Sequence, residues 1–163
     1  MRILLVEDCD FMAKAIKAAL ESNGHQVTWV IGFETNQPLL AIDSDHQPQA
    51  INARDFDIAF VDGQLEGKFE GPAIVEALSS RHIKCAGISS TNDLNDLMLA
   101  AGATMAMLKV TALGAIVENV LTPDFVQRPP RGIHVALESF GAHIRNNKEL
   151  RYKLDQLVKP YMQ

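Results

Sequence analysis

Polar side chains follow four apolar segments of this chain at the points where those segments end. The segments and the residues after them are 2–6 with Glu7 and Asp8, 57–61 with Asp62, 83–88 with Ser89 and Ser90, and 104–108 with Lys109. Because the carboxyl ends of parallel strands meet at one edge of a sheet, these groups come together if the segments are parallel strands. A carboxylate cluster beside an ammonium group suits a hard divalent cation and a phosphoryl group.

Predicted strands and helices alternate from residue 2 to about residue 121. The expected strands cover 2–6, 26–31, 58–61, 83–88 and 104–108; the expected helices cover 11–21, 71–80, 93–100 and 111–121, the last capped by Thr111. This alternation implies right-handed crossovers and a parallel sheet covered on both faces. We expect an α/β fold with a doubly wound five-stranded sheet in the order 2-1-3-4-5, which places Glu7, Asp8 and Asp62 at the topological switch point.

Two stretches of the sequence are not accounted for by a minimal five-stranded α/β fold. Residues 33–47 are predicted to form a surface insertion, followed by a short helix over 48–54. Pro123, Pro129 and Pro130 indicate a stiff linker, and apolar residues at helical spacing predict helices over 132–146 and 148–158. We therefore divide the chain into one domain over 1–121 and a linker with a helical C-terminal extension over 122–163.

The composition of the chain argues against nucleic-acid-binding and membrane-associated proteins. The chain has 163 residues, of which 47% are hydrophobic, and a net charge of -5, which argues against a nucleic-acid-binding surface. No apolar run is long enough to span a bilayer and the N-terminal segment lacks the layout of a signal peptide, so we expect a cytoplasmic location without membrane association. Cys9 and Cys85 have no metal-ligand spacing and are expected to be free thiols.

Asp62 is the best candidate for a nucleophile, because a carboxylate can attack phosphorus and form an acyl phosphate. Glu7 and Asp8 would repel Asp62 unless a cation lies among them. Mg²⁺ suits this position, since it takes few carboxylates, keeps water ligands and bridges phosphate oxygens. The backbone carbonyl of Gln64 is a candidate for a further metal ligand.

Two other strand ends supply groups for the phosphoryl oxygens. Lys109 offers a positive charge, and the Ser89 hydroxyl can form a hydrogen bond to a phosphoryl oxygen. Each of these residues taken alone also fits a solvated turn, a helix cap or a surface lysine. Their combination at successive strand ends favours a functional site.

Residues 1 to about 121 resemble the receiver (CheY-like) domain of two-component response regulators. The matching segments are 3–8 with the acidic pair, 56–62 with the phosphoacceptor, 87–90 with the switch hydroxyl and 107–109 with the lysine. The resemblance implies a flavodoxin-like fold, Mg²⁺ and phosphotransfer from a partner histidine kinase. By this match Asp62 accepts the phosphoryl group, Glu7, Asp8 and Asp62 hold the metal, and Ser89 and Lys109 contact the phosphoryl group.

Three departures affect the parts that such domains use for switching. Leu65-Glu66 stands where the family usually has methionine and proline, Ala106 replaces a usual aromatic residue, and Val110 replaces the usual proline after the lysine. These departures leave an alternative open, a non-switching pseudo-receiver that acts as a protein-binding or dimerisation module. A phosphohydrolase is a further alternative, but its second acid would fall at Gln64, which cannot transfer a proton in that way.

The resemblance therefore leads us to expect a phosphoprotein of signal transduction that works through protein contacts. Its expected partners are a sensor histidine kinase or phosphotransfer protein in a phosphorelay, a downstream protein target, and a second copy of the chain through the C-terminal helices. We do not expect an enzyme, beyond slow autodephosphorylation.

Overall fold

A seven-stranded sheet forms the centre of the computed structural model, which describes residues 1–36, 39–66 and 69–163. The strands are β1 (Arg2–Val6), β2 (Gln26–Asn36), β3 (Leu39–Asp43), β4 (Pro48–Ala50), β5 (Ile58–Asp62), β6 (Lys84–Ser89) and β7 (Met105–Leu108). Their order in the sheet is β4-β3-β2-β1-β5-β6-β7. The five neighbouring strands β2, β1, β5, β6 and β7 run parallel to one another. The predicted doubly wound core with order 2-1-3-4-5 is thereby confirmed, whereas the total of five strands is too low.

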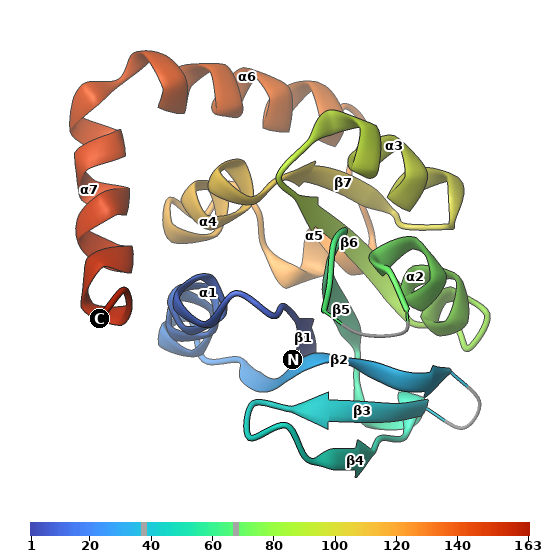
Figure 1. The fold of residues 1–163 in the computed structure, drawn as a ribbon. Helices are drawn as coiled ribbons and strands as arrows, with labels where there is room; N and C mark the ends of the chain where they lie inside the picture. The colour runs from blue at the N-terminus through green and yellow to red at the C-terminus, as the bar shows by residue number, and fades with distance from the viewer. Residues whose placement is uncertain (37–38, 67–68) are drawn as a thin grey trace.

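Helices cover both faces of the parallel core (Figure 1). They are α1 (Asp10–Ser22), α2 (Gly71–Ser79), α3 (Asn92–Ala100), α4 (Lys109–Val117), α5 (Pro123–Gln127), α6 (Ile133–Asn146) and α7 (Lys148–Val158). Successive strand residues point to opposite faces, so Ile3 and Leu5 pack under α1, α4 and the C-terminal helices, while Leu4 and Val6 pack on the side of α2 and α3. Burial on both faces explains why β1 and β5 are continuous apolar runs.

The two additional strands replace the predicted surface insertion. β2 continues past residue 33 and pairs antiparallel with β3, which in turn pairs antiparallel with β4. Phe33, Leu39 and Ala41 are buried, so most of this stretch extends the sheet instead of lying on the surface. Residues 37–38 of the predicted insertion lie outside the described residues.

The helix predicted over 48–54 is wrong. Pro48–Ala50 form the edge strand β4, where proline is tolerated because an edge strand leaves N–H positions unpaired, and a short 3₁₀ helix follows at Ala53–Asp55. The Asn52 side chain caps this turn by accepting a hydrogen bond from the Arg54 backbone N–H at 3.0 Å. Residues 48–50 therefore form a strand because β3 offers backbone groups that can pair with them. The sequence pattern alone does not reveal this pairing.

Two local predictions near the C-terminal part need correction. Thr111 does not cap a helix, because α4 begins at Lys109 and Thr111 lies buried in its first turns. The predicted linker contains the short helix α5, which Pro123 opens in the position where a helix needs no backbone N–H. The helices predicted over 132–146 and 148–158 are present as α6 and α7.

The C-terminal helices pack on the chain's own domain. Ile133, Leu137 and Ile144 of α6 and Leu154 of α7 belong to the same buried cluster as the apolar residues of α1 and α4. In Figure 1, α6 crosses above β7 and α4, and α7 turns down beside α4 and α1. Among the described residues, no helix has both the length and the apolar character needed to cross a membrane.

Candidate functional site

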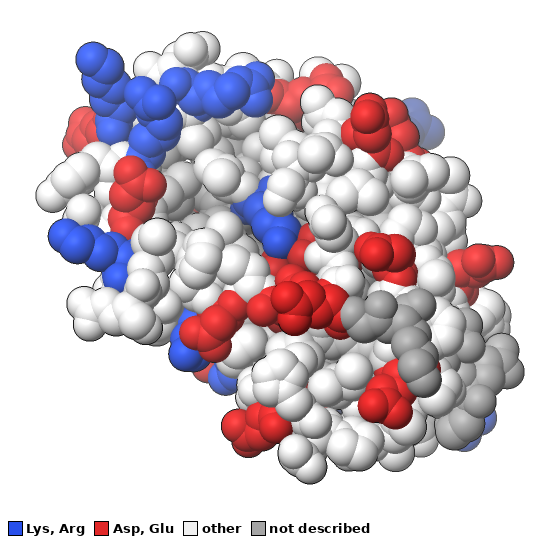
Figure 2. Space-filling model, viewed as in Figure 1, with Lys and Arg blue, Asp and Glu red and all other residues white. Residues whose placement is uncertain are grey.

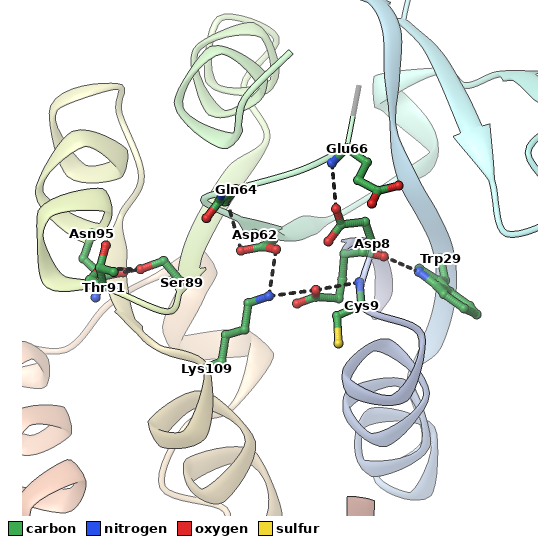
Figure 3. Close-up of polar contacts among 11 residues, drawn as sticks. Asp8, Cys9, Trp29, Asp62, Gln64, Glu66, Ser89, Thr91, Asn95 and Lys109 are labelled. Atoms are coloured by element: carbon green, nitrogen blue, oxygen red, sulfur yellow. Dashed lines mark hydrogen bonds and ion pairs between the residues drawn. The ribbon is translucent and has the colours of Figure 1, made fainter. Parts of the chain in front are cut away.

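Three carboxylates and one amine meet at the carboxyl edge of the parallel strands. Glu7 and Asp8 follow β1, Asp62 ends the adjacent strand β5, and Lys109 begins α4 directly after β7. The Lys109 Nζ donates a hydrogen bond to Glu7 Oε1 at 2.8 Å and to Asp62 Oδ2 at 2.8 Å (Figure 3). The structure thus brings together four residues that lie up to 102 positions apart in the chain.

Neighbouring backbone and side-chain groups hold Glu7 in place. Its backbone N–H donates to the Val30 carbonyl at 3.1 Å, and its carbonyl accepts a hydrogen bond from Trp29 Nε1 at 2.7 Å. The Cys9 N–H donates to Glu7 Oε1 at 3.0 Å. Sequence reasoning missed Trp29, because a single aromatic residue in an apolar strand gives no sign that its ring nitrogen reaches the adjacent strand end.

The segment after β5 holds the other two carboxylates. The Gln64 N–H donates to Asp62 Oδ1 at 3.2 Å, and the Glu66 N–H donates to Asp8 Oδ2 at 2.6 Å. A Cβ on Gly71 would lie 2.1 Å from the Asp62 carbonyl oxygen, so only glycine lets α2 begin this close to the end of β5. The Gln64 carbonyl as a metal ligand stays a prediction.

Burial makes the Glu7 and Asp62 carboxylates unusually basic. The Glu7 side chain is fully buried, and this burial together with the Asp62 charge raises the pKa of Glu7 to about 7, although Lys109 acts in the opposite direction. Burial also raises the pKa of Asp62, partly offset by Lys109. Burial would lower the pKa of Lys109, but its hydrogen bonds to Asp62 and Glu7 outweigh that effect and raise it. Negative charge is therefore in excess over the single amine.

The donor set fits a hard divalent cation. One oxygen each of Glu7, Asp8 and Asp62 lie within 4.8 Å of one another. Glu7 Oε2 is buried and has no hydrogen-bond partner among the described residues. An unpaired buried carboxylate oxygen is costly, and a metal ion with oxygen ligands is a partner that removes this cost. Figure 2 shows acidic side chains gathered over the middle of this face of the molecule.

The structure directs the hydroxyl of Ser89 away from the carboxylates. Ser89 ends β6, and its Oγ lies 2.6 Å from the Thr91 carbonyl oxygen and 2.8 Å from the Asn95 Oδ1 in α3 (Figure 3). A hydroxyl carries one proton, so it donates to one of these acceptors at a time. Asn95 escaped sequence reasoning, because an asparagine inside a helix ordinarily faces solvent, whereas this one is 8% exposed.

Two of the positions that depart from the expected receiver-domain pattern also have defined surroundings. Ala106 of β7 lines a cavity of about 560 Å³ between α3 and α6, together with residues such as Leu99 and His134. Val110, which follows the lysine, is 53% exposed in the first turn of α4. Alanine thus leaves space beside α3.

Solved structures with this fold come from several organisms. The BeF3-activated N-terminal receiver domain of RstA from Klebsiella pneumoniae matches with a TM-score of 0.58 at 18% identity, over 78% of this chain and 99% of that one. A putative response regulator from Chloroflexus aurantiacus gives 0.55 at 15% identity, over 78% and 98%. A CheY-like receiver domain protein from Methanospirillum hungatei gives 0.50 at 20% identity, over 73% and 89%. No family model and no curated protein matches the sequence. By its strand order and these structural matches, the chain has the receiver-domain fold of response regulators.

Proposed function

We propose that this protein is a response-regulator receiver that accepts a phosphoryl group on Asp62 and signals through protein contacts. The phosphodonor would be a sensor histidine kinase or a phosphotransfer protein, and the output would be binding to a downstream protein. The observation that carries this proposal is the cluster of Glu7, Asp8 and Asp62, in which Glu7 Oε2 is buried without a hydrogen-bond partner among the described residues. Lys109 forms hydrogen bonds to Glu7 and Asp62 of this cluster.

In the proposed transfer, an Asp62 carboxylate oxygen attacks phosphorus of a phosphohistidine. The new bond joins this oxygen to phosphorus, and the phosphorus–nitrogen bond breaks with its electron pair going to the imidazole, which takes up a proton. Glu7, Asp8 and Asp62 would hold Mg²⁺, which when bound offsets the negative charge of the phosphoryl oxygens. Lys109 already lies 2.8 Å from Asp62 Oδ2, and in this proposal it would donate a hydrogen bond to a phosphoryl oxygen.

Intact-mass measurement tests the proposal with acetyl phosphate as a small phosphodonor and Mg²⁺. We expect wild-type protein to gain the mass of one phosphoryl group and Asp62→Asn to gain none. Asp45→Asn is a matched control, because Asp45 lies in the exposed turn between β3 and β4 and should leave the gain unchanged. An unmodified wild-type protein, or an equal gain in Asp62→Asn, would rule the proposal out.

A second candidate function is a pseudo-receiver that no longer switches. The space beside Ala106 and the hydrogen bonds that hold Ser89 on Thr91 and Asn95 favour it. Titration with beryllofluoride and Mg²⁺, followed by amide NMR, separates the two functions. Shifts that extend into β7, α4 and α6 support a switch, while shifts confined to the carboxylate pocket support the pseudo-receiver.

We do not propose a phosphohydrolase, because Gln64 offers no acid for proton transfer to a leaving group. Slow autodephosphorylation agrees with the proposal, whereas turnover of external phosphoesters contradicts it. The cytoplasmic location and the homodimer stay predictions. The apolar faces of α6 and α7 already pack on α1 and α4, so a dimer would have to use outward residues such as Val135 and Tyr152, which light scattering can test.

A further inference from the structure

A second cavity lies between the receiver fold and the C-terminal helices. It has a volume of about 680 Å³, within the range of roughly 300–1,000 Å³ typical of small-molecule sites. Its walls are the N-terminal turn of α1, the end of β6, the junction of β7 with α4, and the facing parts of α6 and α7. The cavity therefore exists only because the extension packs where it does.

The wall of this cavity is mostly apolar. Phe11 and Met12 come from α1, Leu108 and Val110 from the β7–α4 junction, and Ile144 from α6. Val110 is 53% exposed, and Phe11 and Met12 are only partly buried. An apolar body that filled the cavity would remove this surface from water.

The charged side chains that line the cavity are all basic. Arg145 near the end of α6 and Arg151 in α7 border it, and neither forms an ion pair with a carboxylate in the described part of the chain. None of the described residues that line the cavity is acidic, although the whole chain carries a net charge of -5. Lys109 also lines it, but Glu7 and Asp62 already neutralise that amine. Figure 2 shows basic side chains gathered over the corner where α6 meets α7.

We propose that this cavity binds an amphipathic small-molecule anion, with an apolar body against Phe11, Leu108 and Val110 and a carboxylate or phosphate group at Arg145 and Arg151. Guanidinium groups are suited to both anions, because their fork of N–H donors matches two oxygens at once. Ser89 and Lys109 line both this cavity and the surroundings of Asp62, so the two sites adjoin. The anionic group is assigned to the arginines, because the carboxylates around Asp62 would repel it. Binding in the cavity does not depend on phosphorylation.

Fluorescence titration with a matched pair of dyes tests this assignment. 8-Anilinonaphthalene-1-sulfonate carries the anionic group, and N-phenyl-1-naphthylamine has the same rings without it. We expect saturable one-to-one binding of the sulfonate by the full chain, weakened on the order of tenfold in the Arg145→Gln/Arg151→Gln double variant. Arg131→Gln, in an exposed arginine outside the cavity, should not change the affinity. The uncharged dye should bind more weakly than the sulfonate, and the arginine substitutions should not change its affinity.

Competition and mapping complete the test. Decanoate and decyl phosphate should each displace the sulfonate dye, and their relative affinities show which head group the site prefers, whereas acetate and inorganic phosphate should not displace it. Amide NMR shifts caused by decanoate should fall at Phe11, Leu108 and Arg151. Val110→Glu, which places a carboxylate in the wall, should abolish binding, whereas Val135→Glu at another exposed valine should not.

Binding should persist in Asp62→Asn, which separates this proposal from the proposed phosphoacceptor function. Equal affinity of the double arginine variant and wild type, or decanoate shifts at a different surface, would overturn the assignment. Absence of saturable binding by any of these anions would also overturn it and leave the cavity to a segment of a protein partner.

Discussion

The ionisation of the buried Glu7 side chain affects the stability of the metal-free protein. Its ordinary pKa is 4.5, and burial raises it to about 7 in the folded chain. A carboxyl with a raised folded pKa stabilises the folded state below its unfolded pKa and loses this contribution as the pH rises to the folded value. The free energy of unfolding of the metal-free protein should therefore fall between about pH 4.5 and pH 7.

Glu7→Gln should remove the Glu7 contribution to this pH dependence, while the raised pKa of Asp62 keeps a contribution of the same sign. At pH 8 without Mg²⁺, we expect the variant to be more stable than wild type by on the order of 2 kcal/mol, because it carries no buried excess charge. The advantage should shrink toward pH 4.5, and Mg²⁺ should stabilise wild type but not the variant. Urea unfolding followed by Trp29 fluorescence measures both effects, with the exposed Glu76→Gln as control. A variant less stable than wild type at pH 8 would contradict this account.

Asn95 and the Thr91 carbonyl group together hold the Ser89 hydroxyl in its resting position. To reach a phosphoryl group on Asp62, Ser89 must leave Asn95 Oδ1 and the Thr91 carbonyl oxygen. Asn95→Ala removes one competing acceptor, so we expect it to bind beryllofluoride a few-fold more tightly than wild type. Ser89→Ala should bind it more weakly. Calorimetric titration in Mg²⁺ measures the affinities, and identical values for all three proteins would show that Ser89 does not contact the phosphoryl position.

The sequence predicts some of the residues at the candidate site and misses others. Glu7, Asp8, Asp62 and Lys109 can be placed together because parallel strands end at a common edge, whatever the loops do. Trp29 and Asn95 cannot, because their roles depend on which way an indole nitrogen and an amide point after the helices pack. The direction of Ser89 likewise follows from the position of α3.

Helix packing at Gly114 holds the extension on the receiver fold. A Cβ at this position of α4 would lie 2.7 Å from the Ile144 Cδ1 of α6 and 3.3 Å from the Leu154 Cδ1 of α7. Gly114→Val should destabilise the protein by about 1–3 kcal/mol through overpacking. Gly114→Ala should be nearly neutral, since a flexible side-chain end can move and alanine favours helix by about 1 kcal/mol. Thermal unfolding by circular dichroism measures both, and equal stability of Gly114→Val and wild type would contradict the packing.

The strands and helices of the parallel core can be predicted from the sequence, whereas the strands added at the edge of the sheet are harder to predict. β1 and α1 follow from apolar periodicity and from Gly24 at the helix end. The β2–β3–β4 extension does not, because an antiparallel edge pairing depends on open hydrogen-bond positions on the neighbouring strand. Pro48 even favours the wrong element, since it opens a helix as readily as it occupies an edge strand.

For the whole molecule, residues 122–163 complete the core of the receiver fold. Ile133, Leu137, Ile144 and Leu154 cover apolar residues of α1 and α4 that would otherwise face water. A chain truncated after residue 128 should therefore lose several kcal/mol of stability and associate through the uncovered surface. Denaturant unfolding and light scattering measure the two effects. A stable, monomeric truncated protein would mean that the extension adds little to the core.

The central claim is that Asp62 accepts a phosphoryl group, and chemical trapping of the acyl phosphate tests it most directly. The protein is treated with acetyl phosphate, then reduced with borohydride, which converts a phosphorylated aspartate to homoserine, and its peptides are sequenced by mass spectrometry. We predict homoserine at position 62 alone, only when Mg²⁺ is present, and none in Glu7→Gln. Homoserine at another position such as Asp8, or at none, would contradict the account.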